Sequence, residues 1–161
     1  MRTVSPACLL VVVVLSALFP PPLQARSQDA LVFGLIATAS PKTVLAQWEL
    51  LLADLGQALG RPVRPQVFTD YAGVVWAMAA GHVDMAWLGN KSAIEAVDRA
   101  GGEVALQALS IDGQAAYRSV ILARAGSGIA TAEDMFARAS ALAYGDGDVN
   151  STSGHVIPGY Y

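Results

Sequence analysis

The stretch from Leu31 to Gly60, LVFGLIATASPKTVLAQWELLLADLGQALG, decides the fold of this chain. Its first seven residues are mostly apolar, which is typical of a buried strand. Ser40 and Pro41 then have the types preferred at a helix N-cap and at the first helical position. Apolar residues recur every three or four positions as far as Gly60, a residue type that commonly ends helices. The stretch therefore predicts a strand followed by a long helix.

The rest of the chain continues this alternation. Further strands are expected at residues 62–68, 83–87, 104–110, 117–124 and 141–144. Further helices are expected after Asp70, over residues 92–100 and after the cap residue Thr131. Because strands alternate with helices of this length, the sequence predicts an α/β fold with a largely parallel sheet.

Residues 1–25 have the composition of a secretory signal peptide. Arg2 is their only charge, residues 7–19 are almost wholly apolar, and Ala25 offers a small residue at the expected cleavage point. We therefore expect an exported protein, periplasmic in a cell with two membranes. Cys8 is the single cysteine of the sequence, so cleavage would leave no thiol for a disulfide or a metal.

The charge balance narrows the possible partners. The sequence has 10 Lys and Arg residues against 13 Asp and Glu residues, a net charge of −3, and removal of Arg2 makes it −4. No basic stripe or run of like charge is present, which argues against nucleic acid and acidic membrane surfaces as partners. An anionic ligand would therefore have to be attracted by local donors rather than by overall charge.

The run from Tyr144 to Gly154, YGDGDVNSTSG, contains three consecutive hydroxyl residues, Ser151, Thr152 and Ser153. It follows an expected strand and leads into an expected helix start. Hydroxyl donors there lie beside unpaired main-chain N–H groups at the positive end of a helix dipole, which outlines a site for a tetrahedral oxyanion. The alternative interpretation is a Ser/Asn-rich loop with an ordinary N-cap.

Two other loops follow expected strands. Asp70–Gly73 comes after the second strand and Trp87–Asn90 after the third. Ligands of parallel sheets bind where loops leave the carboxyl ends of strands, so both loops are candidates. Tyr117 stands at the start of an expected strand, and this rule does not place it in a pocket.

Several residues have plainer interpretations. Asp146 and Asp148 could accept a proton from a monobasic oxyanion, which would favour phosphate or phosphite, but Asp-Gly turn chemistry explains them more simply. A serine hydrolase is expected to show Gly-x-Ser-x-Gly, and the run lacks the first glycine and a recognisable His and Asp to support it. His155 is interpreted as a partly exposed helix residue. No metal ligands stand at the usual spacing.

Several segments resemble the phosphonate-binding periplasmic proteins of ABC importers. They are Thr69–Gly73 (TDYAG), Asp84–Asn90 (DMAWLGN), Glu95–Ala100 (EAVDRA), Asn150–Gly154 (NSTSG) and Pro158–Tyr161 (PGYY). The similarity runs in register from about Leu31 to Tyr161. It implies a periplasmic-binding-protein-like fold of type II, in which two α/β lobes close on the ligand. This chain would contain the first lobe and the start of the second.

The resemblance also implies a site and a partner. Family residues that hydrogen-bond the phosphonate oxygens correspond to Tyr71, Tyr117, Ser151, Thr152 and Ser153. The partner implied is the membrane permease of the importer, with no cofactor, no metal and no catalytic residue. The implied domains are a signal peptide at 1–25, a first lobe at 26–122, and a crossover with an incomplete second lobe at 123–161.

This sequence departs from the family in length. Family proteins are about twice as long, so we expect a fragment without most of the second lobe and its histidine and acidic pocket residues, which binds weakly or not at all. The expected function is the solute-binding component of an ABC importer that captures phosphonates, such as aminoalkyl phosphonates. The alternatives are an exported hydrolase that uses the Ser-Thr-Ser cluster and a binding protein for phosphite or phosphate.

Overall fold

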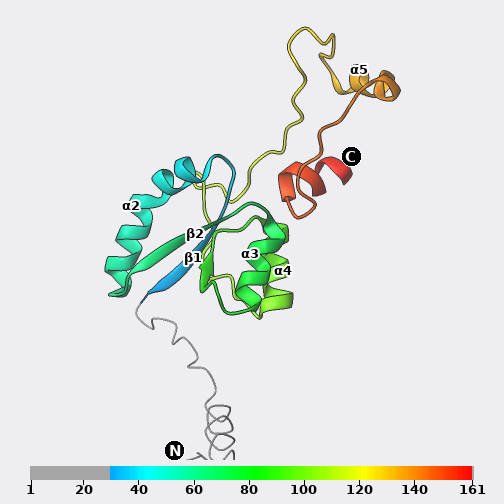
Figure 1. Cartoon of the computed structure of the whole chain (residues 1–161). Helices are drawn as coiled ribbons and strands as arrows, with labels where there is room; N and C mark the ends of the chain where they lie inside the picture. The colour runs from blue at the N-terminus through cyan, green and yellow to red at the C-terminus, as the bar shows by residue number, and fades with distance from the viewer. Residues whose placement is uncertain (1–29, 161) are drawn as a thin grey trace, which may run out of the picture.

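The computed structural model describes residues 30–160, and their centre is a three-stranded parallel sheet with helices on both faces (Figure 1). Strands β1 (Leu31–Ile36), β2 (Val63–Phe68) and β3 (Met85–Ala86) lie in the order β2-β1-β3. Strand β1 pairs along its whole length with β2 and pairs with β3 on its other side. The expected parallel α/β architecture is confirmed. The predicted signal peptide lies outside the described residues.

Three helices flank the sheet. They are α2 (Pro41–Leu59), α3 (Tyr71–Ala79) and α4 (Asn90–Ala100). The Ser40 hydroxyl accepts a hydrogen bond from the Thr43 N–H, and the Asp70 carboxylate accepts one from the Gly73 N–H at 2.7 Å. Gly60 ends α2 with a left-handed φ of 62°, a conformation that glycine adopts without a Cβ clash.

The two faces of β1 bury different helices. Phe33 and Leu35 form a core with Val44 and Leu52 of α2. Gly34 points to the other face, where a Cβ would lie 2.7 Å from the Val74 side chain of α3. The absence of a side chain at Gly34 therefore allows α3 to approach the sheet closely.

The parallel direction of the strands places two of the candidate loops at one edge of the sheet. The chain moves outward from β1 to β2 and then crosses back to β3, so the two crossovers run in opposite directions. Parallel crossovers are almost always right-handed, which puts α2 on one face and α3 and α4 on the other (Figure 1). All three strands are parallel, so the loops after β2 and β3 leave the same edge of the sheet, the carboxyl edge where ligands of such sheets bind.

Three predicted strands are wrong. Residues 104–110, 117–124 and 141–144 form no strand, and the expected strand at 83–87 is reduced to the two residues of β3. Leu106 and Leu122 are each 89% exposed. A strand persists where a neighbouring strand supplies hydrogen bonds and a packed face. Within the described part of the chain these segments have no such neighbour in the sheet, although their apolar composition suits a strand.

The chain beyond residue 130 forms short helices. Helix α5 (Ala132–Ala137) begins with a capping box between Thr131 and Asp134, as the sequence indicated. Three short turns follow: η2 (Ala139–Ala141), the π-helical η3 (Thr152–Val156) and η4 (Pro158–Tyr160). Within residues 30–160, no helix has the length and apolar character needed to cross a bilayer.

Replacing Leu35 by alanine tests the role of β1 in the core. Leu35 is 1% exposed, so Leu35→Ala should lower the free energy of unfolding by about 2–5 kcal/mol. Leu50 lies on α2 and is 80% exposed, so Leu50→Ala should change it by no more than about 0.5 kcal/mol. Urea unfolding measures both variants. Equal losses would contradict the assignment of Leu35 to the core.

Candidate functional site

Three segments that are distant in the sequence meet at Gly89. Tyr71 begins α3 directly after β2, Gly89 follows β3, and Thr152 belongs to the hydroxyl run. A Cβ placed on Gly89 would lie 3.5 Å from the Thr152 hydroxyl oxygen and 4.0 Å from Cε1 of Tyr71. The structure therefore brings together two of the predicted site residues, both half-buried, at the carboxyl edge of the sheet.

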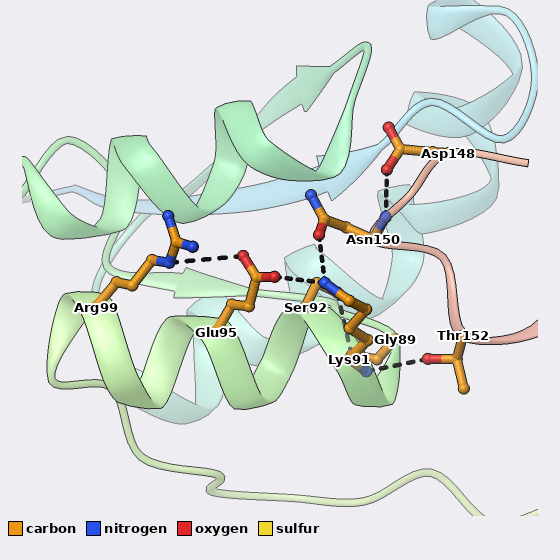
Figure 2. Close-up of polar contacts among 8 residues, drawn as sticks. All are labelled: Gly89, Lys91, Ser92, Glu95, Arg99, Asp148, Asn150 and Thr152. Carbon is orange, nitrogen blue, oxygen red and sulfur yellow. Dashed lines mark hydrogen bonds and ion pairs between the residues drawn. The ribbon is translucent and has the colours of Figure 1, made fainter. Parts of the chain in front are cut away.

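The hydroxyl oxygens of the run accept hydrogen bonds from main-chain N–H groups. Thr152 Oγ1 accepts from the Lys91 N–H at 3.0 Å and thereby caps α4, whose own N-cap residue, Gly89, has no side chain (Figure 2). Ser151 Oγ accepts from the Gly154 N–H at 3.1 Å. A hydroxyl that accepts at its oxygen still has its proton to donate. Both side chains are therefore prepared to donate to an anion.

The run leads into a helical turn, as the sequence indicated. The turn η3 has five π-helical residues, with Ser151 as its N-cap. The Ser151 hydroxyl therefore occupies the N-cap position at the start of this turn.

Ser119 is a neighbour of the run that the sequence did not reveal. Its hydroxyl donates to the main-chain oxygen of Ser153 at 2.6 Å. Tyr117 lies two residues earlier, is 64% exposed, and is joined to the run by no described hydrogen bond.

Lys91 is the cation closest to the run. Its ammonium donates to Asn150 Oδ1 at 2.6 Å and to Glu95 Oε1 at 2.5 Å, and Arg99 Nε lies 3.7 Å from Glu95 Oε2 (Figure 2). The hydrogen bond from Lys91 is the main cause that lowers the pKa of Glu95 below its usual value. The Lys91–Glu95 spacing is a recognisable helix pair. Asn150 is 59 positions from Lys91, and no sequence signal indicated that contact.

Asp146, Asp148 and His155 close the loop in front of the run. Asp148 Oδ1 accepts from the Asn150 N–H at 2.8 Å, which is turn chemistry of the kind that the sequence suggested. His155 Nδ1 lies 2.6 Å from Asp146 Oδ2. Loop closure therefore brings a His and an Asp together next to the run, a pairing that the sequence did not reveal. No described hydrogen bond joins the His155 ring to a hydroxyl of the run.

Among residues 30–160, no group of three or more His, Cys, Asp or Glu side chains is placed to hold a metal ion.

Alanine at Gly147 should disturb the loop that holds the run. Its Cβ would lie 2.8–2.9 Å from main-chain atoms of Gly154, which cannot rotate away. We expect Gly147→Ala to accelerate hydrogen exchange of residues 147–157 by about tenfold or more, which corresponds to about 1.4 kcal/mol and lies within the usual cost of overpacking. Gly145→Ala is the control, because nothing lies within 4 Å of its Cβ position. Similar exchange rates in the two variants would contradict the close approach.

The ion pair on α4 should stabilise the fold in a pH-dependent way. A carboxyl pKa lowered on folding contributes stability that is present above the unfolded pKa and is lost as pH falls through the folded pKa. Between about pH 5 and pH 3, the native chain should therefore lose more unfolding free energy than Glu95→Gln does. Urea unfolding across this range measures the difference, and identical slopes would contradict the contribution of Glu95.

Comparison with known proteins places the site in a wider context. The profile of a family described as periplasmic substrate-binding proteins of phosphonate ABC transporters matches residues 33–161. The chain is 42% identical over 147 residues to the phosphonates-binding periplasmic protein of Escherichia coli strain K12. The aligned region covers 91% of this chain and 44% of that protein.

A solved structure gives the same picture. The chain superposes with a TM-score of 0.79 and 44% identity on the crystal structure of a binding protein component of an ABC phosphonate transporter from Pseudomonas aeruginosa. This match covers 83% of the present chain and 44% of the other. The chain thus spans less than half the length of both relatives.

Proposed function

This chain belongs to the family of periplasmic substrate-binding proteins of phosphonate ABC transporters, and we propose that it captures a phosphonate in the periplasm for delivery to a membrane permease. The observation that carries the proposal is the meeting of Tyr71 and Thr152 around Gly89. In the proposal the protein binds and releases its ligand without chemical change. Residues 26–122 form the first lobe and residues 123–161 the crossover and the start of the second.

The donor chemistry supports a tetrahedral anion as the ligand. A phosphonate group presents three oxygens that accept hydrogen bonds, and Ser151 and Thr152 have hydroxyl protons to donate because their oxygens accept from main-chain N–H groups. Each hydrogen bond to a charged group contributes about 1.5–3 kcal/mol. Three to five such bonds would support micromolar binding, about −8 kcal/mol, after the costs of ordering and closure.

Tyr117 and Ser153 are proposed as further ligand-binding residues. The hydrogen bond from Ser119 to the main-chain oxygen of Ser153 holds the segment that contains Tyr117 beside the run. Tyr117 is exposed at this position, so its phenol is accessible to a ligand that lies against the run.

Calorimetric titration tests the function. The ligands are methylphosphonate, 2-aminoethylphosphonate, phosphite and phosphate. Because the chain spans less than half of its relatives, two proteins are titrated: residues 26–161, and a graft in which residues 30–160 replace the matching part of the Pseudomonas aeruginosa relative. We expect stoichiometric heat without turnover in the graft, larger for the phosphonates than for phosphate. No binding by the graft would overturn the proposal.

The Asp146–His155 pair is the one observation that favours the alternative, an exported hydrolase. It lies in the loop that leads to the run, and a His–Asp pair is the usual support of a serine nucleophile. In the proposal the pair closes the loop instead, because Ser151 Oγ accepts from the Gly154 N–H and no described hydrogen bond joins it to His155. Product formation from a phosphonate or carboxylic ester, lost in His155→Asn, would favour the hydrolase.

Removal of two hydroxyls should weaken binding strongly. In the graft, Ser151→Ala with Thr152→Ala should cost roughly 2–5 kcal/mol of binding free energy for methylphosphonate, from two lost hydrogen bonds to a charged group. Tyr71→Phe should cost less, because the ring and its packing remain. Ser140→Ala is the control, since Ser140 is an exposed serine outside the site. Unchanged affinity in the double variant would show that the run is only a helix cap.

A further inference from the structure

Lys91 contacts the chain on both sides of Ser151. Its main-chain N–H donates to the Thr152 hydroxyl at 3.0 Å, and its ammonium donates to Asn150 Oδ1 at 2.6 Å (Figure 2). One residue of α4 therefore holds the segment just before and just after Ser151. Helix α4 also packs against the turn η3, and these two hydrogen bonds join α4 directly to the start of the run.

The Lys91 ammonium is fixed by a second partner. Glu95, one turn further along α4, accepts from it at 2.5 Å and is itself close to Arg99. The side chains of Lys91 and Glu95 are 35% and 21% exposed, so the pair is only partly screened by water. A charged donor held between a carboxylate and the Asn150 amide is a more rigid anchor than a freely rotating surface lysine.

We infer that Lys91 is a positioning residue that sets the Ser151–Ser153 run against the first lobe, so that the run presents its hydroxyl protons to the ligand. The inference rests on the proposed function. In this inference Lys91 acts through Asn150 and Thr152, which accept from its ammonium and its main-chain N–H, while Glu95 fixes the ammonium on α4. By accepting from the Lys91 N–H, Thr152 turns its proton away from α4.

Hydrogen exchange on the full chain without ligand tests this role. Lys91→Met removes the ammonium and keeps a side chain of similar length. We expect it to accelerate exchange of residues 150–157 by about tenfold, the loss of one charge-assisted hydrogen bond, with little change in β1 and β2. Lys91→Arg should restore most of the protection, because guanidinium also donates to Asn150 and Glu95. Lys42→Met, at the other lysine of the sequence, is the matched control on α2.

Asn150 provides the second half of the test. Asn150→Ala should accelerate exchange as Lys91→Met does, and the double variant should add little to either, since both remove the same hydrogen bond. Equal exchange of residues 150–157 in native, Lys91→Met and Lys42→Met chains would overturn the inference. Additive effects of the two substitutions would also overturn it.

Ligand binding separates this inference from the proposed function. Methylphosphonate titrated into the graft carrying Lys91→Met should bind about tenfold more weakly, with rescue by Lys91→Arg. Weaker binding with unchanged exchange would mean that Lys91 contacts the anion directly and would contradict the positioning role. Altered exchange with no phosphonate binding by the native graft would support the positioning of the run and reject the proposed function alone.

Discussion

Strand β1 is hydrogen-bonded on both edges and packed on both faces, and the described fold depends on this double constraint. Phe33 and Leu35 pack against α2 on one face of the strand. On the other face, the lack of a side chain at Gly34 allows α3 to approach closely. Because β1 is central, the chain must leave it in one direction and return in the other. Because all three strands are parallel, the loops after β2 and β3 leave the same edge of the sheet, and the candidate site lies at that edge.

The site built at that edge uses neutral donors. Thr152 completes the N-terminus of α4, where Gly89 has no capping side chain, and Ser151 caps its own short turn. In both cases the hydroxyl oxygen accepts a hydrogen bond from a main-chain N–H, and the hydroxyl proton is still available to donate. The same residues can therefore stabilise the fold and donate to a ligand. In the proposed function, a negatively charged chain binds an anion through such local donors rather than through its overall charge.

Local signals in the sequence were sufficient for the starts of α2, α3 and α5 but not for α4, whose start is capped by the distant Thr152. The capping residues Ser40, Asp70 and Thr131 each accept the hydrogen bond that their type predicts, because a cap depends only on the next three residues. The apolar segments at 104–110 and 117–124 were wrongly predicted to be strands. A strand needs a neighbouring strand to pair with, and that neighbour can lie anywhere in the chain. Residue composition alone does not supply that information.

The site was only partly predictable for the same reason. The hydroxyl run was visible as a motif, and Tyr71 stood at the end of an expected strand, but Tyr117 came only from the family resemblance. The contacts Lys91–Asn150 and Ser119–Ser153 join residues 59 and 34 positions apart. The Asp146–His155 pair spans nine positions and depends on how the loop closes. Such contacts depend on how the chain folds, and the spacing of residues in the sequence does not predict them.

A crystal structure of the graft with methylphosphonate tests the central claim most directly. The account predicts phosphonate oxygens within hydrogen-bond distance of the Thr152 and Ser151 hydroxyls, with the Tyr71 side chain bordering the same pocket. A phosphorus atom bound elsewhere, with the run still capping α4 and contacting no ligand, would contradict it.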